Sequence, residues 1–243
     1  MIETIAVIIA RAGSRGLPKK NMRLLNGMPL VAWSIEHALG SQFADAVVLT
    51  SDGQDILAVG RRYGINVYER SKAEASDTAT IDSAVRHGVE SWEAHHGTTC
   101  RRVAILYANV VLRPPDLTDR AVHKLIQTGA DSVQCLYPVG AVHPLWMRRL
   151  AGPQNDVVEN YEPNEIYRRQ DLPPVYMISS GVIAVTRSSL FDVDSDHPHA
   201  FLGRDRRAIV TAKRDVVDID DESDLLVAEA MLAQRQSRPR KAS

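Results

Sequence analysis

Short apolar runs alternate with helix-length amphipathic segments from the first residues to about residue 137. The first run, residues 5–10, is rich in β-branched side chains, which is typical of a parallel strand buried on both faces. Further strands are predicted at 46–51, 66–69, 102–107 and 132–137. Helices are predicted over about 29–39, 54–63, 81–94 and 116–129, the last with Asp116 as its N-cap and Asp119 three residues on. This alternation predicts an α/β fold in which right-handed crossovers build a mainly parallel sheet with helices on both faces.

The alternation breaks between about residues 140 and 176. Six prolines between residues 138 and 174 separate polar and aromatic residues there. We interpret this stretch as an ordered arm that leaves the core. Strands are predicted again at 181–186, 208–211 and 216–220, followed by a final helix over 221–234. Residues 1–139 and 177–236 are therefore expected to form the core, 140–176 the arm, and 237–243 a frayed tail.

Composition narrows the class of protein. The 243 residues are 44% apolar and 24% charged, and 29 basic residues against 30 acidic ones give a net charge of −1. Such a balance argues against binding nucleic acid or a membrane surface through bulk charge, and no apolar run reaches the ~20 residues needed to span a bilayer. Cys100 and Cys135 cannot form a disulfide framework, so reduced thiols and a cytoplasmic location are expected. We expect an intracellular enzyme.

A basic, glycine-containing loop follows the first predicted strand. Gly13 and Gly16 let backbone N–H groups approach an anion, and Ser14 adds a hydroxyl. Four cations lie within ten residues: Arg11, Arg15, Lys19 and Lys20. The spacing fits neither the P-loop pattern nor the dinucleotide-binding pattern, which disfavours both classes. Because ligands of open parallel sheets bind at the carboxyl ends of the strands, the loop is predicted to hold a triphosphate; a solvated turn is the alternative.

Polar residues also follow other predicted strands. Asp52 could hold a ribose hydroxyl or a metal, although Ser-Asp-Gly is also ordinary turn chemistry. Asp77 or Thr78 is a good N-cap for the helix that begins near residue 81, and capping alone would explain either residue. Asn109 and Arg113 follow the strand at 102–107 and are expected at the mouth of the sheet.

Near the C-terminus, Asp218 and Asp220 alternate with apolar residues. In an extended segment both carboxylates point to the same side, which suits Mg²⁺ when the cation also takes phosphate oxygens. The alternative is an acidic cluster that caps the last helix, a role that Asp221 can fill by itself. The histidines lack zinc-ligand spacing, and a serine-hydrolase elbow is missing from the sequence.

Taken in order, these blocks resemble a known family. Residues 8–21 (IIARAGSRGLPKKN), 24–30 (LLNGMPL), 48–53 (VLTSDG), Arg70 with 75–79 (ASDTA), and 217–220 (VDID) together are similar to acylneuraminate cytidylyltransferases, the CMP-sialic acid synthetases. The resemblance covers essentially the whole chain. It implies a Rossmann-like core and a reaction in which the hydroxyl of a nonulosonic acid attacks the α-phosphate of CTP. It also implies Mg²⁺, with Mn²⁺ as a substitute, and a homodimer in which each subunit lends its arm to the partner.

The resemblance assigns roles by motif position. It places the nucleotide against Arg11, Ala12, Gly13, Ser14, Arg15, Lys20, Asn21, Arg70 and Thr80, with Arg11 and Lys20 as catalytic cations and Asn21 at the cytosine edge. The sugar acid is expected to contact Tyr107, Asn109, Arg113, Trp146 and Arg169. The metal is assigned to Asp218 and Asp220.

Several positions depart from the pattern of the family. Arg15 replaces a Lys, Tyr107 a Gln, Trp146 a Lys, and Ser180-Gly181 an Asn-Gly pair. Most of these changes fall on the sugar side, so the substrate could be a relative of sialic acid, such as pseudaminic, legionaminic or a deaminated acid. The alternatives are a nucleotidyltransferase for another sugar acid, such as an octulosonate, and a non-catalytic protein that binds nucleotide or sugar.

Overall fold

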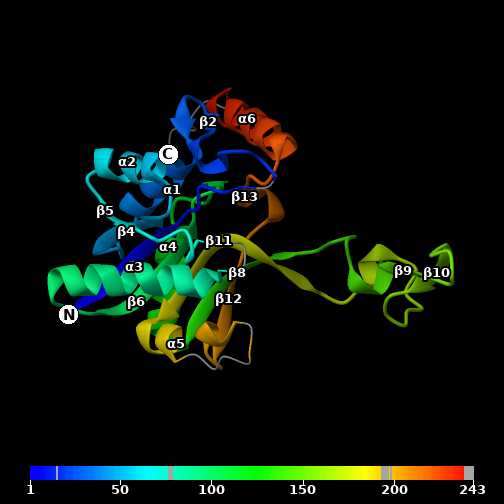
Figure 1. Cartoon of the computed structure of the whole chain (residues 1–243). Coiled ribbons are helices and arrows are strands. Elements are labelled where there is room, and N and C mark those ends of the chain that lie inside the picture. Colours follow the sequence, from blue (N-terminus) through cyan, green and yellow to red (C-terminus); the bar gives the residue numbers. More distant parts are fainter. Residues whose placement is uncertain (15, 76–78, 193–196, 198, 238–243) are drawn as a thin grey trace.

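The computed structural model describes residues 1–14, 16–75, 79–192, 197 and 199–237, with a seven-stranded sheet at its centre (Figure 1). Its strands are β1 (Ile2–Ile9), β4 (Ala46–Ser51), β5 (Asn66–Glu69), β6 (Cys100–Tyr107), β8 (Ser132–Pro138), β11 (Tyr176–Thr186) and β12 (Arg206–Val210). They lie in the order β12-β8-β11-β6-β1-β4-β5. β11 runs antiparallel to both of its neighbours, and the other pairs are parallel. The predicted α/β class with a mainly parallel sheet is confirmed.

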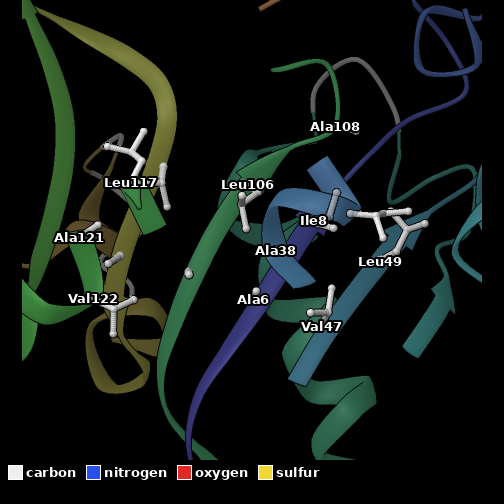
Figure 2. Close-up of a cluster of buried hydrophobic side chains, with 14 of the residues drawn as sticks. Ala6, Ile8, Ala38, Val47, Leu49, Leu106, Ala108, Leu117, Ala121 and Val122 are labelled. Atoms are coloured by element: carbon white, nitrogen blue, oxygen red, sulfur yellow. The ribbon is translucent and has the colours of Figure 1, made fainter. Parts of the chain in front are cut away.

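Alternate residues of each strand bury themselves on opposite faces of the sheet. Ala6 and Ile8 pack with helices α1 (Leu30–Leu39), α2 (Gln54–Arg62) and α4 (Leu117–Thr128), a cluster drawn in Figure 2. Ile5 and Val7 pack on the other side with α3 (Ile81–His96) and the short α5 (Arg187–Phe191). Burying such a side chain contributes roughly 1.5–3 kcal/mol relative to leaving it exposed. Helices on both faces were predicted from this pattern.

A third apolar cluster joins a segment near the N-terminus to the last helix of the chain. Leu17 and Leu25 come from the segment after β1, and Val111 lies on β7 (Val110–Leu112). Ile219 precedes α6 (Glu222–Ser237), and Leu225 lies on that helix. The predicted strand at 216–220 is shorter, β13 (Val217–Asp218), and pairs antiparallel with β7 outside the main sheet. The cluster therefore brings the loop after β1 and the C-terminal carboxylates together.

A small hairpin that the sequence analysis did not predict precedes α1. It pairs β2 (Leu24–Leu25) with β3 (Met28–Pro29) around Asn26 and Gly27, whose φ angles are 50° and 77°. Asn-Gly is the favoured pair where both residues of a two-residue turn need positive φ. The hairpin orients the start of α1, where Pro29 occupies the N-cap position.

The predicted side-chain cap of α4 is wrong. Asp116 stands at the N-cap position but makes no capping hydrogen bond, and its carboxylate lies 3.8 Å from Arg120. The carboxylate of Asp119 accepts hydrogen bonds from the Ser41 hydroxyl and the Gln42 N–H instead, which ties α4 to the turn after α1. In the part of the chain that the structure describes, no helix is long and apolar enough to cross a membrane.

The segment between β8 and β11 projects from the sheet and carries a hairpin at its far end (Figure 1). This hairpin pairs β9 (Arg148–Ala151) with β10 (Val157–Asn160). At the root, His143 hydrogen-bonds through Nε2 to the carbonyl of Pro173 at 3.0 Å. We refer to residues 139–175 as the arm. The division predicted from the sequence, with residues 1–139 and 177–236 as the core and residues 140–176 as the arm, stays a prediction.

Candidate active site

A cavity of about 520 Å³ opens at the carboxyl ends of β1 and β6. The residues that line it come from the loop after β1, the segment before α3, the end of β6 and the turn before α6. They are Ile9, Ala10, Arg11, Ser14, Gly16, Lys20, Asn21, Arg70, Ala75, Ala79, Thr80, Ile81, Ala84, Tyr107, Asn109 and Asp220. Nine of the residues assigned from the sequence lie among them: Arg11, Ser14, Lys20, Asn21, Arg70, Thr80, Tyr107, Asn109 and Asp220.

The loop after β1 is held at both of its ends by acidic residues. At its start, the N–H of Ala12 donates to Oδ1 of Asp52 at 2.8 Å. At its end, the ammonium of Lys20 lies 2.7 Å from Oδ1 of Asp220. Gly16 packs so closely that a Cβ there would lie 2.6 Å from the carbonyl oxygen of Asp220. The loop is thus fixed against the segment before α6, and Asp52 supports the loop rather than lining the cavity.

The loop residues differ in how they face the cavity. The side chain of Lys20 is 17% exposed and that of its partner Asp220 is 70% exposed, so an anion in the cavity could reach the ammonium and a cation the carboxylate. Lys19, the neighbouring cation, is exposed and does not line the cavity. Ala12 and Gly13 belong to the loop backbone without lining the cavity, and Arg15 lies outside the described residues.

Asn21 is buried beside the loop, and the oxygen of its side-chain amide is unpaired among the described residues. Its Nδ2 donates to the carbonyl oxygen of Arg11 at 2.9 Å, which fixes the orientation of the amide because a carbonyl oxygen only accepts. Its Oδ1 is buried and accepts no hydrogen bond from the described residues. A buried acceptor without a donor costs free energy, so this oxygen marks a place where a ligand donor would fit.

Arg70 also lines the cavity, but as a buried residue. The residue is 4% exposed, and its guanidinium donates to the carbonyl oxygens of Ala10 and Glu74. Burial lowers the pKa of Arg70, and the nearby carboxylates of Asp52 and Glu74 partly offset that effect. Its Nε has no partner among the described residues. The cavity therefore holds a desolvated positive charge with an unused donor.

Tyr107 and Asn109 line the cavity at the end of β6. Burial raises the pKa of Tyr107 to about 12, so its phenol keeps its proton at neutral pH and can donate a hydrogen bond. Nδ2 of Asn109 donates to the carbonyl oxygen of Ile219 at 3.1 Å. This contact joins β6 to the turn that carries Asp220.

The structure places Arg113 behind the cavity wall, away from the other residues assigned to the sugar acid. It is 7% exposed and does not line the cavity. Its Nε donates to the carbonyl oxygen of Gly181 at 2.6 Å, and its other nitrogens donate to the carbonyl oxygens of Val110 and Tyr107 and to the Ser34 hydroxyl. Burial lowers its pKa to about 9. Its donors hold the backbone together, and the contact with the sugar acid stays a prediction that the placement of this residue does not support.

Trp146 and Arg169 lie on the arm and do not line the cavity of their own chain. The indole N–H of Trp146 donates to the carbonyl oxygen of Ile166 at 2.9 Å. Their assignment to the sugar side stays a prediction, and it requires an arm from another subunit.

The three aspartates before α6 have separate partners. Oδ2 of Asp218 accepts a 2.6 Å hydrogen bond from the Ser180 hydroxyl, whereas Asp220 faces the cavity and pairs with Lys20. Oδ1 of Asp221 accepts the N–H of Asp224 at 3.0 Å, as expected of a helix cap. Among the described residues, no group of three or more Asp, Glu, His or Cys side chains could hold a metal by itself.

The sequence analysis did not predict the small apolar residues that line the cavity. Ala75, Ala79, Ile81 and Ala84 flank or begin α3, and Ile9 and Ala10 end β1. The signal was present, because residues 75–79 belong to a block that carries the family resemblance. Only Thr80 was assigned from this region; its hydroxyl caps α3 by accepting the N–H of Ser83. Asp77 and Thr78 lie outside the described residues.

Three comparisons with known proteins agree with this picture. A family model for cytidylyltransferases matches residues 5–195. The chain is 28% identical to the pseudaminic acid cytidylyltransferase of Campylobacter jejuni over 236 residues, covering 95% of this chain and 96% of that protein. It is 28% identical to the CMP-N,N'-diacetyllegionaminic acid synthase of Legionella pneumophila over 234 residues, covering 96% of this chain and 97% of that protein.

Among solved structures, one neighbour is a CMP:2-keto-3-deoxy-manno-octonic acid synthetase complexed with CTP. The TM-score is 0.71 at 15% identity, over 96% of this chain and 99% of that one. At this level of identity the likeness concerns the fold alone.

Proposed function

Because the chain belongs to the cytidylyltransferase family, we propose that it transfers the cytidylyl group of CTP to a hydroxyl of a nonulosonic acid. The hydroxyl oxygen bonds to the α-phosphorus, the bond to the β-phosphate oxygen breaks, and pyrophosphate leaves. The named activities of the pseudaminic and diacetyllegionaminic acid relatives support this class of acceptor. A screen of several nonulosonic acids identifies which one is used.

The observation that carries the proposal is the buried, unpaired Oδ1 of Asn21. One N–H of the same amide is committed to the carbonyl of Arg11, which fixes the amide so that the unpaired atom it offers a ligand is the acceptor Oδ1. Cytosine presents an exocyclic amino donor where uracil presents a carbonyl acceptor. The geometry therefore supports a cytosine nucleotide over a uracil nucleotide, since two facing acceptors would leave both unpaired.

The cations of the loop suit the triphosphate of the same nucleotide. Arg11 and Lys20 line the cavity on the side of the loop where backbone N–H groups can approach phosphate oxygens. Negative charge grows on the leaving pyrophosphate during the reaction, and fixed cations stabilise it more than water does in a partly enclosed site. We assign Arg11 and Lys20 to this role, with Ser14 and Thr80 as further polar contacts.

A divalent cation fits the carboxylates on this edge of the sheet. Asp220 lines the cavity with an exposed carboxylate, and Asp218 lies two residues before it. Two hard oxygen ligands are too few for an all-protein site, but Mg²⁺ is commonly held by one or two carboxylates together with substrate phosphates and water. Mg²⁺, or Mn²⁺ in its place, would supply positive charge to the phosphates when bound. Asp218 and Asp220 would hold it.

We further propose that the active form is a homodimer in which the arm reaches the partner. The hairpin of the arm exposes apolar side chains that a monomer leaves in water: Leu150 is 60% exposed, Val158 63% and Tyr161 58%. Trp146 and Arg169 on the same arm do not line the cavity of their own chain. An exchanged arm would bury the first group and bring the second to a sugar acid.

The test is a substrate screen of the purified protein with Mg²⁺. CTP, UTP, ATP and GTP are each combined with N-acetylneuraminate, pseudaminate, legionaminate and a 3-deoxy-octulosonate, and pyrophosphate and the nucleotide sugar are measured. We expect turnover with CTP and at least one nonulosonic acid. Turnover with the octulosonate alone, with another nucleotide alone, or with no pair would contradict the proposal.

A variant of Asn21 tests directly whether its unpaired Oδ1 selects the base of the nucleotide. Asn21→Leu keeps the volume of the side chain and removes its acceptor. We expect the preference for CTP over UTP, measured by calorimetry, to fall by roughly tenfold or more. Equal weakening of both nucleotides would mean that Asn21 only supports the loop.

A further inference from the structure

β11 carries a bulge of three residues opposite β8. Ser179 pairs with Cys135 and Ile183 pairs with the adjacent Gln134, so residues 180–182 have no counterpart on the partner strand. At the centre of the bulge, a Cβ on Gly181 would lie 2.8 Å from Cδ2 of Leu117, so the backbone is packed against the start of α4. Bulges re-aim side chains, and they are common beside active sites.

A buried arginine fixes the shape of this bulge. Nε of Arg113 donates to the carbonyl oxygen of Gly181 at 2.6 Å, while Nη1 donates to Val110 at 2.8 Å and Nη2 to Tyr107 at 3.0 Å. A guanidinium is costly to bury unless its donors are used, and here they cross from the bulge to the end of β6 and to β7. The bulge and the cavity wall that carries Tyr107 therefore form one rigid unit.

The bulge presents Ser180 to the aspartate that precedes the cavity. The hydroxyl of Ser180 donates to Oδ2 of Asp218 at 2.6 Å, across 38 residues of sequence. Asp218 ends β13, whose pairing with β7 is itself irregular at this residue. A hydrogen bond to one oxygen fixes the rotation of a carboxylate and so sets the direction of its other oxygen.

The kind of donor matters as much as its position. Asp220 is held by the ammonium of Lys20, which neutralises part of its charge. Asp218 is held by a neutral hydroxyl, which orients the carboxylate and leaves its negative charge available to a cation. Second partners of this kind commonly tune how tightly a metal ligand binds.

We infer that Ser180 is a positioning residue, which the bulge of β11 holds in place to orient the carboxylate of Asp218 toward the divalent cation that accompanies CTP. This inference rests on the proposed function, because it needs Asp218 as a metal ligand. Ser180 contacts neither the nucleotide nor the sugar acid in this role.

The test measures how much a divalent cation strengthens CTP binding. Calorimetry gives the Kd of CTP in EDTA and in saturating Mn²⁺, and the ratio of the two is the metal-dependent gain. We expect Ser180→Ala to lower this gain roughly tenfold while the Kd in EDTA stays unchanged. Ser180→Thr, which keeps the hydroxyl, is expected to retain most of the gain. Ser179→Ala is the matched control, because Ser179 is buried at the foot of the bulge and, in the part of the chain that the structure describes, forms no hydrogen bond with Asp218.

Two results would overturn the inference: a Ser180→Ala protein with the wild-type gain, or one that loses affinity equally with and without Mn²⁺. Asp218→Asn separates this failure from failure of the proposed site. If Asp218→Asn abolishes the gain and Ser180→Ala does not, only the inference is wrong. If Asp218→Asn also keeps the gain, the proposed metal site is wrong and the inference falls with it.

Discussion

The cavity of the core and the hairpin of the arm differ in whether the side chains of each find partners within one chain. In the cavity, residues from the loop after β1, from β6 and from the turn before α6 converge within a single chain. On the arm, Val158 and Tyr161 are more than half exposed, and Tyr167 is 93% exposed. The part of the site proposed for the nucleotide is therefore built by one chain, whereas the arm, which is proposed to contact the sugar acid, leaves apolar side chains without a surface to pack against.

The largest expected effect concerns the cavity, whose lining comes from one chain. Lys20→Ala removes the ammonium that faces the cavity 2.7 Å from Asp220. We expect kcat to fall by ~10² or more, because one such donor to the developing charge is typically worth ~3 kcal/mol. Steady-state kinetics with CTP and the accepted sugar acid measure this.

Lys19→Ala is the matched control for that change. Lys19 is the adjacent residue and carries the same charge, but it is exposed and does not line the cavity. An exposed charge of this kind is worth less than ~1 kcal/mol, so kcat should change by no more than roughly fivefold. Equal losses in the two variants would mean that the loop acts through its net charge, not through a positioned donor.

The next effect asks whether the two halves come from different subunits. Lys20→Ala disables the core half and Arg169→Ala the arm half, and each variant is expected to be inactive. In mixed dimers with exchanged arms, one site of two receives neither change, so random mixing should restore roughly one quarter of wild-type activity. Activity and native mass spectrometry are measured on the same mixture. Heterodimers that form without recovering activity would mean that the arm serves its own chain.

A smaller effect concerns the surface of the arm. Val158 lies directly opposite Leu150 in the β9–β10 hairpin, and both are exposed. Val158→Asp places a charge on this apolar pair, and burying an unpaired charge at an interface should raise the dimer Kd by at least about tenfold. Gln154→Asp adds the same charge in the exposed turn of the hairpin and should leave the Kd alone. Analytical ultracentrifugation compares them, and a Val158→Asp dimer of wild-type affinity would remove this face from the interface.

The smallest effect leaves activity at neutral pH untouched and concerns only the core. Burial lowers the pKa of His37 to about 4, with Arg113 nearby lowering it further and Asp119 opposing both. Between the ordinary pKa of 6.5 and this value the unfolded chain binds more protons, so stability falls as the pH falls. Between about pH 7 and pH 5 we expect His37 to account for a loss of ~2 kcal/mol.

His37→Gln should flatten this part of the stability profile, because glutamine does not titrate. Urea unfolding of both proteins at several pH values gives the comparison. Parallel profiles for the variant and the wild type would show that His37 is protonated without cost in the folded core.

The same contrast explains what could be predicted from the sequence. Strands such as β1 were predictable because the continuous apolar run Ile5, Ala6, Val7 and Ile8 is a local pattern that burial on both faces of the sheet imposes. The loop after β1 was predictable because glycines and cations gather within a few residues. The α/β fold, the cytidylyltransferase family and the enzyme class are confirmed on that basis.

The places where the structure departs from the sequence pattern share a physical cause. Arg113 follows a strand and was expected at the mouth of the sheet, but it does not line the cavity, and its shortest hydrogen bond is to Gly181, 68 residues away in the sequence. Asp119 likewise bonds to the turn after α1 and not to its own helix. A side chain that can bond in several directions is committed by tertiary packing, which no local pattern encodes. The roles of the cavity residues themselves remain predictions.

The arm leaves and re-enters the sheet through adjacent antiparallel strands. Tyr176 pairs with Pro138, and the N–H of Val139 donates to the carbonyl oxygen of Val175 at 3.1 Å. In topological terms the arm is an enlarged hairpin loop, so its length and sequence can vary without moving any strand of the core. Replacing it by a two-residue turn between residues 138 and 176 is a conservative graft. The fold thereby lets the arm change in evolution while the sheet and the cavity at its edge stay the same.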